Sequence, residues 1–397
     1  MASVIQRIFR EHFDGYRRGQ SLPARILKAA QAIRACRTAA LGGHVQTCPA
    51  GHVERVWYNS CRHRACPLCA FVRVSEWIQQ QLARLPACDY YHVVFTLPSE
   101  LNRFWEADRQ AVTNLFFRTA WEALEELLGD AKYLGALPGA IATFQSWGQN
   151  LWVHPHVHLL VTGGGLDADG QWVKAKAAFL LPSRVLSAKF RGKFLALFRR
   201  AVERAELALP AGCSEAQARS LCNKLGRRKW HVQIMPPYAH GRGVLTYLGR
   251  YVRGGPISDR RIAGYDGQTV QIRCKDYAGA PAGEAPVRRT VRLTAAEFLE
   301  RLGWHVPVPG THMVRAYGLF APNQRERLNR ARALLGQLPV APAEALDWQT
   351  ACAAAGPQHP ECCPVCGQRL IVRPLPEFRP SAPRAEPTDR SRWRLAG

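Results

Sequence analysis

Residues 154–161 read HPHVHLLV, and this stretch decides both the fold and the chemistry expected of the chain. Side chains alternate between the two faces of a strand, so His154, His156 and His158 share one face and apolar residues occupy the other. His156 and His158 are then about 6–7 Å apart along the strand, close enough to bind one cation. Three histidines on one face favour metal ligation over the alternative of histidines satisfied within a core. Imidazole ligands by themselves favour Zn²⁺ or another transition metal.

The residues on either side of the histidines predict where this strand begins and ends. Pro155 places the start at or just before it, or marks an edge or bulge, which makes His154 the weakest candidate ligand. Glycines 163–165 predict the end of the strand, with open space beside the site.

Outward from the histidine strand, the pattern predicts an α+β fold, because strands and helices do not alternate strictly. Two short helices are expected within residues 1–35, and others at 72–85, 99–128, 183–209, 242–253, 294–303 and 322–335. Strands are expected at 92–97, 140–147, 153–162, 230–235, 257–262, 268–274 and 287–293.

A second motif, YLGRY at residues 247–251, lies in the expected helix 242–253. Residues four apart are neighbours on a helix, so Tyr247 and Tyr251 share one edge of the apolar stripe. Two tyrosines packed at the rim of a core would explain the motif on its own. A phenol has a pKa of about 10 and needs a polarised target to act as a nucleophile. A histidine-bound cation on a phosphate oxygen would provide that polarisation, so the two motifs together favour a pair of nucleophiles.

Taken together, these motifs resemble the HUH endonucleases, and more closely the two-tyrosine transposases of the Insertion Sequence 91 family. The resemblance covers about residues 5–372, and its ordered matches are CRTAALGGH (36–44), YNSCR (58–62), FTLP (95–98), WGQNL (147–151), the histidine strand, FRGKF (190–194), YLGRY (247–251), IS (257–258) and YGL (317–319).

The resemblance implies an HUH-type nuclease domain with a central antiparallel sheet flanked by helices, preceded by a helical zinc-binding domain. It also implies rolling-circle transposition, in which a tyrosine forms a 5′-phosphotyrosine and releases a 3′-hydroxyl. His156 and His158 would hold Mg²⁺ or Mn²⁺, in contrast to the Zn²⁺ that imidazole alone favours. The third ligand stays open among Gln145, Gln149 and His154.

Cysteines cluster near both ends of the chain, which predicts thiolate–metal sites rather than disulfides. The C-x₂-C pair Cys66 and Cys69 predicts a structural Zn²⁺ site. The expected ligands are Cys48, His52 or Cys61, Cys66 and Cys69, with Cys36 and His63 in reserve and room for two ions. The chain lacks one cysteine that the family usually has after the Gly-Gly-His stretch, so the ligand set stays open.

A second knuckle, CCPVCG at residues 362–367, has no clear partner pair nearby, although Cys352 and His359 could complete a site. Four other cysteines are isolated and are expected to be inert thiols: Cys88, Cys213, Cys222 and Cys274.

The charge of the chain predicts a nucleic-acid partner. It has 54 Lys and Arg against 30 Asp and Glu, a net charge of +24, which is typical of proteins that bind polyanions. The expected DNA contacts are Arg62, Arg64, Lys189, Arg191, Lys193, Arg227, Arg228, Lys229 and Arg250, with Trp230 as a stacking platform for single-stranded DNA. No apolar run is long enough to span a membrane, and no signal peptide is evident. Together with the family resemblance, which implies a bacterial source, these features predict a cytoplasmic, nucleoid-associated protein.

Five segments are expected along the 397 residues: a helical zinc- and DNA-binding domain (1–85), the HUH nuclease domain (86–335), a linker (336–360), a candidate zinc knuckle (361–372) and a basic tail (373–397). The sequence makes no prediction of the oligomeric state. Two rival functions fit some of the motifs. One is a rolling-circle replication initiator or relaxase with the same chemistry, and the other is a zinc-finger DNA-binding protein without nuclease activity.

Overall fold

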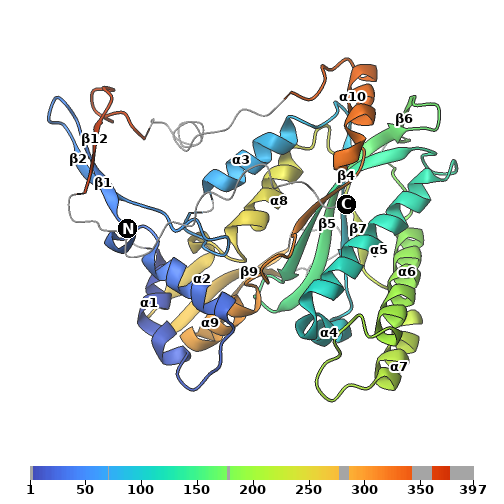
Figure 1. Ribbon diagram of the computed structural model, residues 1–397, viewed down its shortest axis with the longest axis horizontal. Coiled ribbons are helices and arrows are strands. Elements are labelled where there is room, and N and C mark those ends of the chain that lie inside the picture. The colour runs from blue at the N-terminus through green and yellow to red at the C-terminus, as the bar shows by residue number, and fades with distance from the viewer. Residues whose placement is uncertain (1–2, 70, 177–178, 277–285, 342–359, 376–397) are drawn as a thin grey trace.

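The computed structural model describes residues 3–69, 71–176, 179–276, 286–341 and 360–375 (Figure 1). Its helices are α1 (Val4–Tyr16), α2 (Ala24–Ala35), α3 (Phe71–Leu82), α4 (Asn102–Ala107), α5 (Arg109–Gly129), α6 (Ser183–Glu203), α7 (Glu215–Gly226), α8 (Arg242–Gly254), α9 (Ala295–Trp304) and α10 (Arg325–Leu334). Its strands are β1 (Gly43–Thr47), β2 (Glu54–Tyr58), β3 (Tyr90–Thr96), β4 (Leu137–Trp147), β5 (Val153–Leu166), β6 (Trp172–Lys174), β7 (Val232–Ile234), β8 (Ile262–Tyr265), β9 (Thr269–Asp276), β10 (Val287–Thr294), β11 (Val314–Gly318) and β12 (Ile371–Pro374). The α+β prediction is confirmed.

The central sheet has the strand order β11-β4-β5-β3-β7, with β6 added to the far end of β5. Its pairings are antiparallel throughout. β5 is therefore hydrogen-bonded on both sides, to β3 and to β4, which places the histidine strand in the interior of the sheet.

Helices cover both faces of this sheet (Figure 1). On one face, Phe95, Phe144 and Val157 pack against the aromatic side chains of α5 and α6. On the other face, Ile141 and Leu160 pack against α3, α8 and α10. The alternation of β5 explains this division, because Val157 and Leu159 point to the α5–α6 face while the histidines point to the α3–α8 face.

A second core joins the N-terminal helices to the later part of the chain. Sheet β10-β9-β8 packs Val270 and Ile272 against α9 and against Ile5 and Ile8 of α1. The expected boundary at residues 85/86 is therefore crossed by a shared hydrophobic core.

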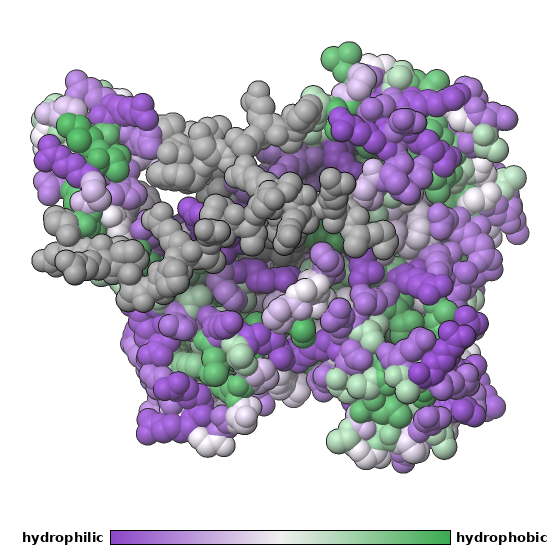
Figure 2. Space-filling view, viewed as in Figure 1, coloured by the Kyte–Doolittle hydropathy of each residue, from purple (hydrophilic) through white to green (hydrophobic). Residues whose placement is uncertain are grey.

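The third sheet, β12-β1-β2, stands apart from the body of the protein (Figure 1). The β1–β2 hairpin projects outward and β12 returns from the C-terminal end to pair with β1. Figure 2 shows apolar surface on this sheet, where Val56 and Tyr58 of β2 and Ile371 and Val372 of β12 are exposed.

The remaining element predictions differ from the structure in a few places. The expected helix 99–128 is divided at Asp108, whose side chain caps α5. α7 and the strands β1, β2, β6, β11 and β12 were not predicted, and the expected strand 257–262 begins only at Ile262, in β8. β12 includes Arg373 and Pro374, which the sequence assigned to the tail. Cys352 and His359, the suggested partners of the C-terminal knuckle, lie outside the described residues.

Candidate functional site

The histidine strand presents its imidazoles from the middle of the central sheet. His156 is paired with Gln145 of β4 and with Thr96 of β3, and His158 with Thr143 and Val94. His156 and His158 share a face, as their spacing predicts. The rings of His156 and His158 are 4.7 Å apart between centroids.

Two further side chains reach this pair of histidines. Gln145 Oε1 lies 3.1 Å from His156 Nε2, and His92 Nε2 of β3 lies 2.9 Å from His158 Nδ1. Sequence reasoning proposed Gln145 but missed His92, because a strand pattern does not say which strand lies beside it. Gln149 turns instead toward β9, where its Oε1 accepts a long hydrogen bond from the backbone of Lys275. His154 is exposed at the start of the strand.

Burial keeps these imidazoles neutral. It lowers the pKa of His92 and of His156 to about 4, and that of His158 well below its usual value. A neutral imidazole offers the lone pair that a metal ligand needs.

The donors gathered at the histidine face are imidazole nitrogens and one amide oxygen, which suit a divalent transition ion such as Mn²⁺ better than Mg²⁺. Among the described residues, the groups with three or more donors within 4.8 Å of one another are both cysteine-rich, so the imidazoles are adjacent without forming a closed cage.

The turn that leads into the histidine strand is held by three side chains from the second core. Arg261 donates to Gln149 O, Arg301 donates to Asn150 O at 3.0 Å, and His305 Nε2 lies 2.9 Å from Leu151 O. Leu151 has φ 63° and is fully buried. Each carbonyl of residues 149–151 is thus occupied, which explains the WGQNL motif as the fixed entry to β5.

The glycines after the histidines lie inside β5 and do not leave open space, contrary to the prediction. A Cβ on Gly164 would meet Trp172 of β6 at 2.5 Å, and one on Gly165 would meet Leu137 O at 2.4 Å. Glycine is required here because two neighbouring strands approach closely.

The tyrosine helix α8 packs on the histidine face of the sheet. Leu245 and Leu248 are buried against Leu160, which follows His158 by two residues on the same face of β5. α8 also packs on α3, where a Cβ on Gly249 would approach Ile78 at 2.9 Å. Gly249 lies on one edge of the buried stripe of α8. By helical periodicity, positions 247 and 251 lie on the other edge, one turn apart. The side chains of Tyr247, Arg250 and Tyr251 lie outside the described part of the structure.

The structure divides the zinc-ligand candidates into two groups. Cys36, Cys61, Cys66 and Cys69 form one, and Cys48, His52, Cys363 and Cys366 form the other. The expected set that joined Cys48 to Cys66 and Cys69 is not brought together. Cys48 follows β1 at the tip of the hairpin and Cys61 follows β2 at its base, so five residues of strand, about 17 Å, separate them.

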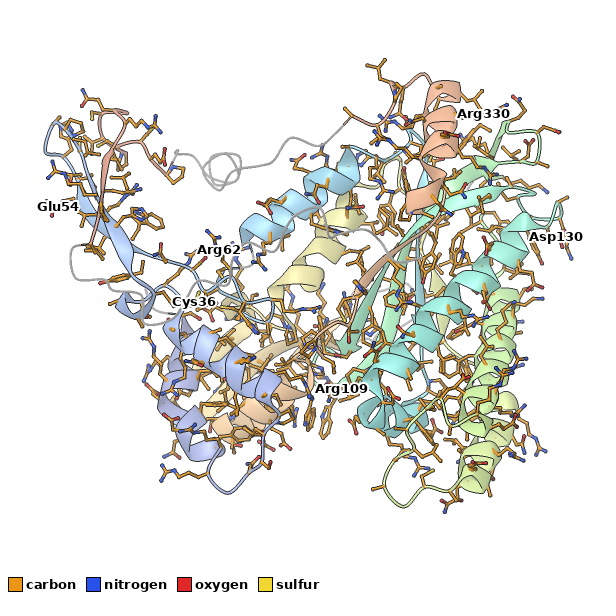
Figure 3. All side chains as sticks on the ribbon, viewed as in Figure 1. Cys36, Glu54, Arg62, Arg109, Asp130 and Arg330 are labelled. Carbon is orange, nitrogen blue, oxygen red and sulfur yellow. The ribbon has the colours of Figure 1, made fainter. Side chains whose placement is uncertain are left out.

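The first group lies where the hairpin meets the body of the protein. Figure 3 labels its member Cys36 and the neighbouring Arg62 there, and shows Glu54 farther out on the hairpin. The sulfurs of Cys61 and Cys69 are 3.7 Å apart. Hydrogen bonds from neighbouring thiols, that of Cys36 foremost, lower the pKa of Cys69. His63 belongs to neither group, and its Nδ1 accepts a hydrogen bond from Ala65 N.

Much of the basic surface predicted on α6 and in the segment that follows α7 is already paired. Lys189 and Lys193 both form ion pairs with Glu126 of α5, and Arg228 pairs with Glu100. Trp230 is only 5% exposed, so it belongs to the core and is no stacking platform. α6 packs on the face of the sheet opposite to the histidines.

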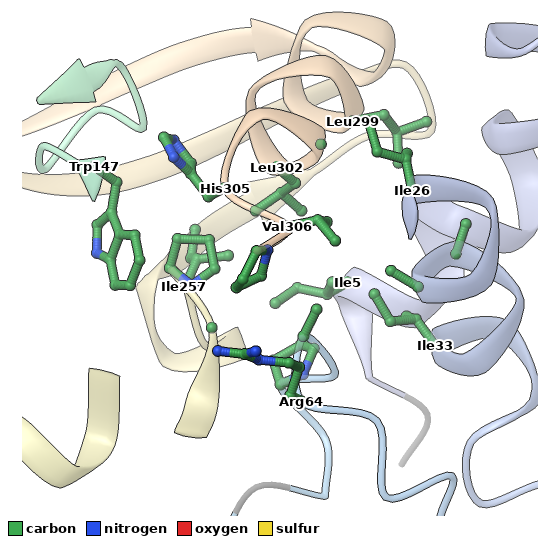
Figure 4. A pocket seen from close by; sticks show the side chains of 18 of the residues that line it. Ile5, Ile26, Ile33, Arg64, Trp147, Ile257, Leu299, Leu302, His305 and Val306 are labelled. Atoms are coloured by element: carbon green, nitrogen blue, oxygen red, sulfur yellow. The ribbon is translucent and has the colours of Figure 1, made fainter. Parts of the chain in front are cut away.

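The other predicted contacts are more dispersed. Arg191 donates to Arg228 O, while Arg62, Arg227 and Lys229 are exposed. Arg64 lies beside an apolar cavity of about 50 Å³ between α1, α2 and α9 (Figure 4). The described residues that line this cavity do not include His156 or His158, so it is separate from the histidine face.

A basic surface that sequence reasoning missed lies on the outer face of β9 and β10. Lys275 is paired with Arg288, and Arg273 and Arg292 follow on the same face in the same register. All four are exposed, while the inner face carries Val270, Ile272 and Leu293. Alternation of apolar with polar or basic residues, regular in β9 and broken only at Arg289 in β10, is the signal that could have revealed it. β9 contacts the turn at Gln149, so this surface begins beside the entry to the histidine strand.

Comparisons of the sequence with known proteins identify the family of the chain. Residues 139–327 match the Y2_Tnp family, described as "Putative transposase", and residues 8–97 match the transposase zinc-binding domain of the IS91 type. The chain is 36% identical over 347 residues to the "Putative transposase y4qJ" of Sinorhizobium fredii, covering 86% of each chain. It is 30% identical over 355 residues to the "Transposase for insertion sequence element IS801" of Pseudomonas savastanoi pv. phaseolicola, covering 85% of this chain and 80% of the relative.

No solved structure matches the chain. Among the described residues, no helix has the apolar length required to cross a bilayer. The sequence matches cover most of both relatives and include both the zinc-binding and the histidine–tyrosine regions, so the chain belongs to the Insertion Sequence 91 family of transposases and carries that family's N-terminal zinc-binding domain.

Proposed function

We propose that this transposase cuts and rejoins single DNA strands through a 5′-phosphotyrosine during rolling-circle transposition. One observation carries the proposal: α8, which contains Tyr247 and Tyr251, packs on the same face of the central sheet as His156 and His158. Helix and strand are far apart in sequence, and burial of Leu245 and Leu248 against Leu160 brings them together.

The cleavage step exchanges one phosphodiester for another. The hydroxyl of Tyr247 or Tyr251 attacks phosphorus, a P–O bond to the tyrosine forms, and the bond from phosphorus to the 3′ oxygen breaks. The phenolic proton is lost and the 3′ oxygen takes up a proton to become a hydroxyl. Because bonds of the same class are broken and formed, the 3′-hydroxyl of a second end can reverse the reaction and join the strands. The second tyrosine allows a second cleavage while the first end is still attached.

The histidine face supplies the ligands for a divalent cation, Mg²⁺ or Mn²⁺. His156 and His158 would hold it, and Gln145 and His92 are the nearest further donors. When bound, such an ion polarises a phosphate oxygen and so makes the phosphorus a better target for a phenol. The burial of His92 and Gln145 fixes the neighbouring rings, as outer-shell partners of metal ligands usually do.

We further propose that the DNA backbone approaches along the basic face of β9 and β10. Lys275 and Arg288 are exposed there beside the turn that enters β5. Phosphate contacts of this kind supply affinity without sequence preference. The helix α6 is a weaker candidate, because Lys189 and Lys193 are both held in ion pairs with Glu126.

A covalent-adduct assay tests the proposed chemistry. The protein is incubated with single-stranded DNA that contains an end of its element, in Mn²⁺ or Mg²⁺, and is analysed on a denaturing gel. We expect a slower-migrating protein–DNA adduct that requires the metal ion. The double variant Tyr247→Phe/Tyr251→Phe should form none, and an adduct of normal yield from it would place the nucleophile elsewhere.

A further inference from the structure

The second cysteine group draws its donors from the two ends of the chain. Cys48 and His52 lie in the turn between β1 and β2, and Cys363 and Cys366 lie just before β12. Cys48 and Cys366 are 318 positions apart in the sequence, yet their sulfurs lie 3.6 Å apart. The zinc-domain match ends at residue 97 and the transposase match at residue 327, so neither includes the C-terminal pair.

The backbone at both pairs forms the same kind of closed turn. Cys48 N donates to Val53 O and Cys363 N donates to Gln368 O, each at 2.8 Å. Each turn contains a glycine with positive φ, 77° at Gly51 and 73° at Gly367. The N–H of that glycine donates to the carbonyl of the first cysteine of its turn, at 2.9 Å in both cases. Such turns direct two side chains toward one point, as zinc knuckles do.

The distances within the group match those of a tetrahedral zinc site. Bonds of about 2.3 Å to sulfur and 2.0–2.1 Å to nitrogen put two sulfurs about 3.8 Å apart, and a sulfur and a nitrogen about 3.6 Å apart. The structure has 3.6 Å from Cys48 Sγ to Cys366 Sγ and 3.6 Å from Cys48 Sγ to His52 Nδ1. All four donor atoms lie within 4.8 Å of one another. Three thiolates and one imidazole are a donor set that selects Zn²⁺.

The module has little else to hold it together. Its core consists of Cys48, Cys363 and Leu370, with Val53 packed against them. A three-stranded sheet of such short strands has too small a core to be stable alone, so a metal would supply most of its folding free energy.

We propose that Cys48, His52, Cys363 and Cys366 bind a second structural Zn²⁺, which fastens the C-terminal strand β12 to the N-terminal hairpin. The ion makes one zinc ribbon from two segments at opposite ends of the chain. Its removal releases β12 from β1, whereas the first cysteine group stays intact at the base of the hairpin.

Zinc content and cysteine protection test this proposal in the full-length protein. The wild type should contain about two equivalents of Zn²⁺ and the double variant Cys363→Ser/Cys366→Ser about one. Each protein is then treated with N-ethylmaleimide, and the modified cysteines are identified by mass spectrometry. Cys48 should be protected in the wild type and modified in the double variant, although the substitutions are more than three hundred residues away.

Two controls separate this result from general unfolding. Cys362→Ser changes the neighbouring cysteine, which belongs to neither group, and should keep both zinc equivalents and the protection of Cys48. In the double variant, the four cysteines of the first group should stay protected. The proposal is overturned if the double variant keeps both zinc equivalents, if Cys48 stays protected in it, or if both groups lose protection together.

Discussion

His305 provides a quantitative test of how the entry to the histidine strand is held. Its Nδ1 lies 3.0 Å from Ser146 Oγ and its Nε2 lies 2.9 Å from Leu151 O, and the side chain is only 5% exposed. Burial lowers the pKa of His305 to about 4, against about 6.5 in an unfolded chain. Between about pH 6.5 and pH 4, His305 is therefore protonated in the unfolded chain but neutral in the folded chain. The contribution of neutral His305 to the free energy of unfolding is fully present above pH 6.5 and is lost as the pH falls toward 4.

These two pKa values set the size of the effect. Integrating the difference in bound protons from pH 7 to pH 5 gives a loss of about 2 kcal/mol in the free energy of unfolding. His305→Gln keeps an amide that can bond to Ser146 and Leu151 but does not titrate. We expect this variant to be about 1–2 kcal/mol less stable at pH 7, because its hydrogen bonds are less well placed. It should then lose about 2 kcal/mol less than the wild type between pH 7 and pH 5.

Urea unfolding followed by tryptophan fluorescence at both pH values measures these differences. Other groups, including the zinc ligands, also titrate in this range, but they are common to both proteins and cancel in the comparison. The exposed His240→Gln is the matched control and should lose stability as the wild type does. If His305→Gln were as sensitive to pH as the wild type, His305 would not be the buried neutral partner of the turn.

The remaining predictions concern the reaction and the DNA. His158→Ala should abolish adduct formation and leave DNA binding within about twofold in a filter-binding assay, because cation and affinity are supplied by different residues; normal nicking would remove the metal assignment. At least one of Tyr247→Phe and Tyr251→Phe should still form an adduct, while both should fail in a cell-based transposition assay; full transposition by either would leave a one-tyrosine enzyme. Lys275→Glu should weaken DNA binding and lower the salt dependence by about one phosphate contact. Lys189 is already paired with Glu126, so Lys189→Ala should change neither the DNA affinity nor its salt dependence. If Lys189→Ala had the larger effect, the DNA-binding surface would be on α6 instead.

The parts of the site that were predictable depend on local periodicity. The two-residue repeat places His156 and His158 on one face of β5 wherever the strand lies in the sheet. The 3.6-residue repeat likewise predicts an apolar stripe on α8 made of Val244, Leu245, Leu248 and Val252. The first three are buried, and the side chain of Val252 lies outside the described part of the structure. These inferences need only the local chain, and they agree with the structure.

The parts that were not predictable depend on which elements become neighbours. His92 lies beside His158 only because β3 pairs with β5, and no pattern within either strand specifies that pairing. Cys48 meets Cys366 only because β12 returns to β1 from the far end of the chain. The prediction that the strand ends at Gly164 was wrong for the same reason. A glycine is needed there because Trp172 of β6 approaches closely.

The two faces of the central sheet differ, and under the proposed function this difference sets how DNA would reach the histidines. The α5–α6 face is closed by a large aromatic core, and Glu126 and Glu100 neutralise basic side chains on its surface. On the other face, the turn at 149–151 bonds directly to β9 and to the arginines of the second core. The positive charge of the exposed Arg273, Lys275, Arg288 and Arg292 on β9 and β10 therefore lies beside the entry to the histidine strand. A strand of DNA held by that charge would lead toward His156 and the helix of the two tyrosines, and the same path from the α6 side would have to cross the sheet.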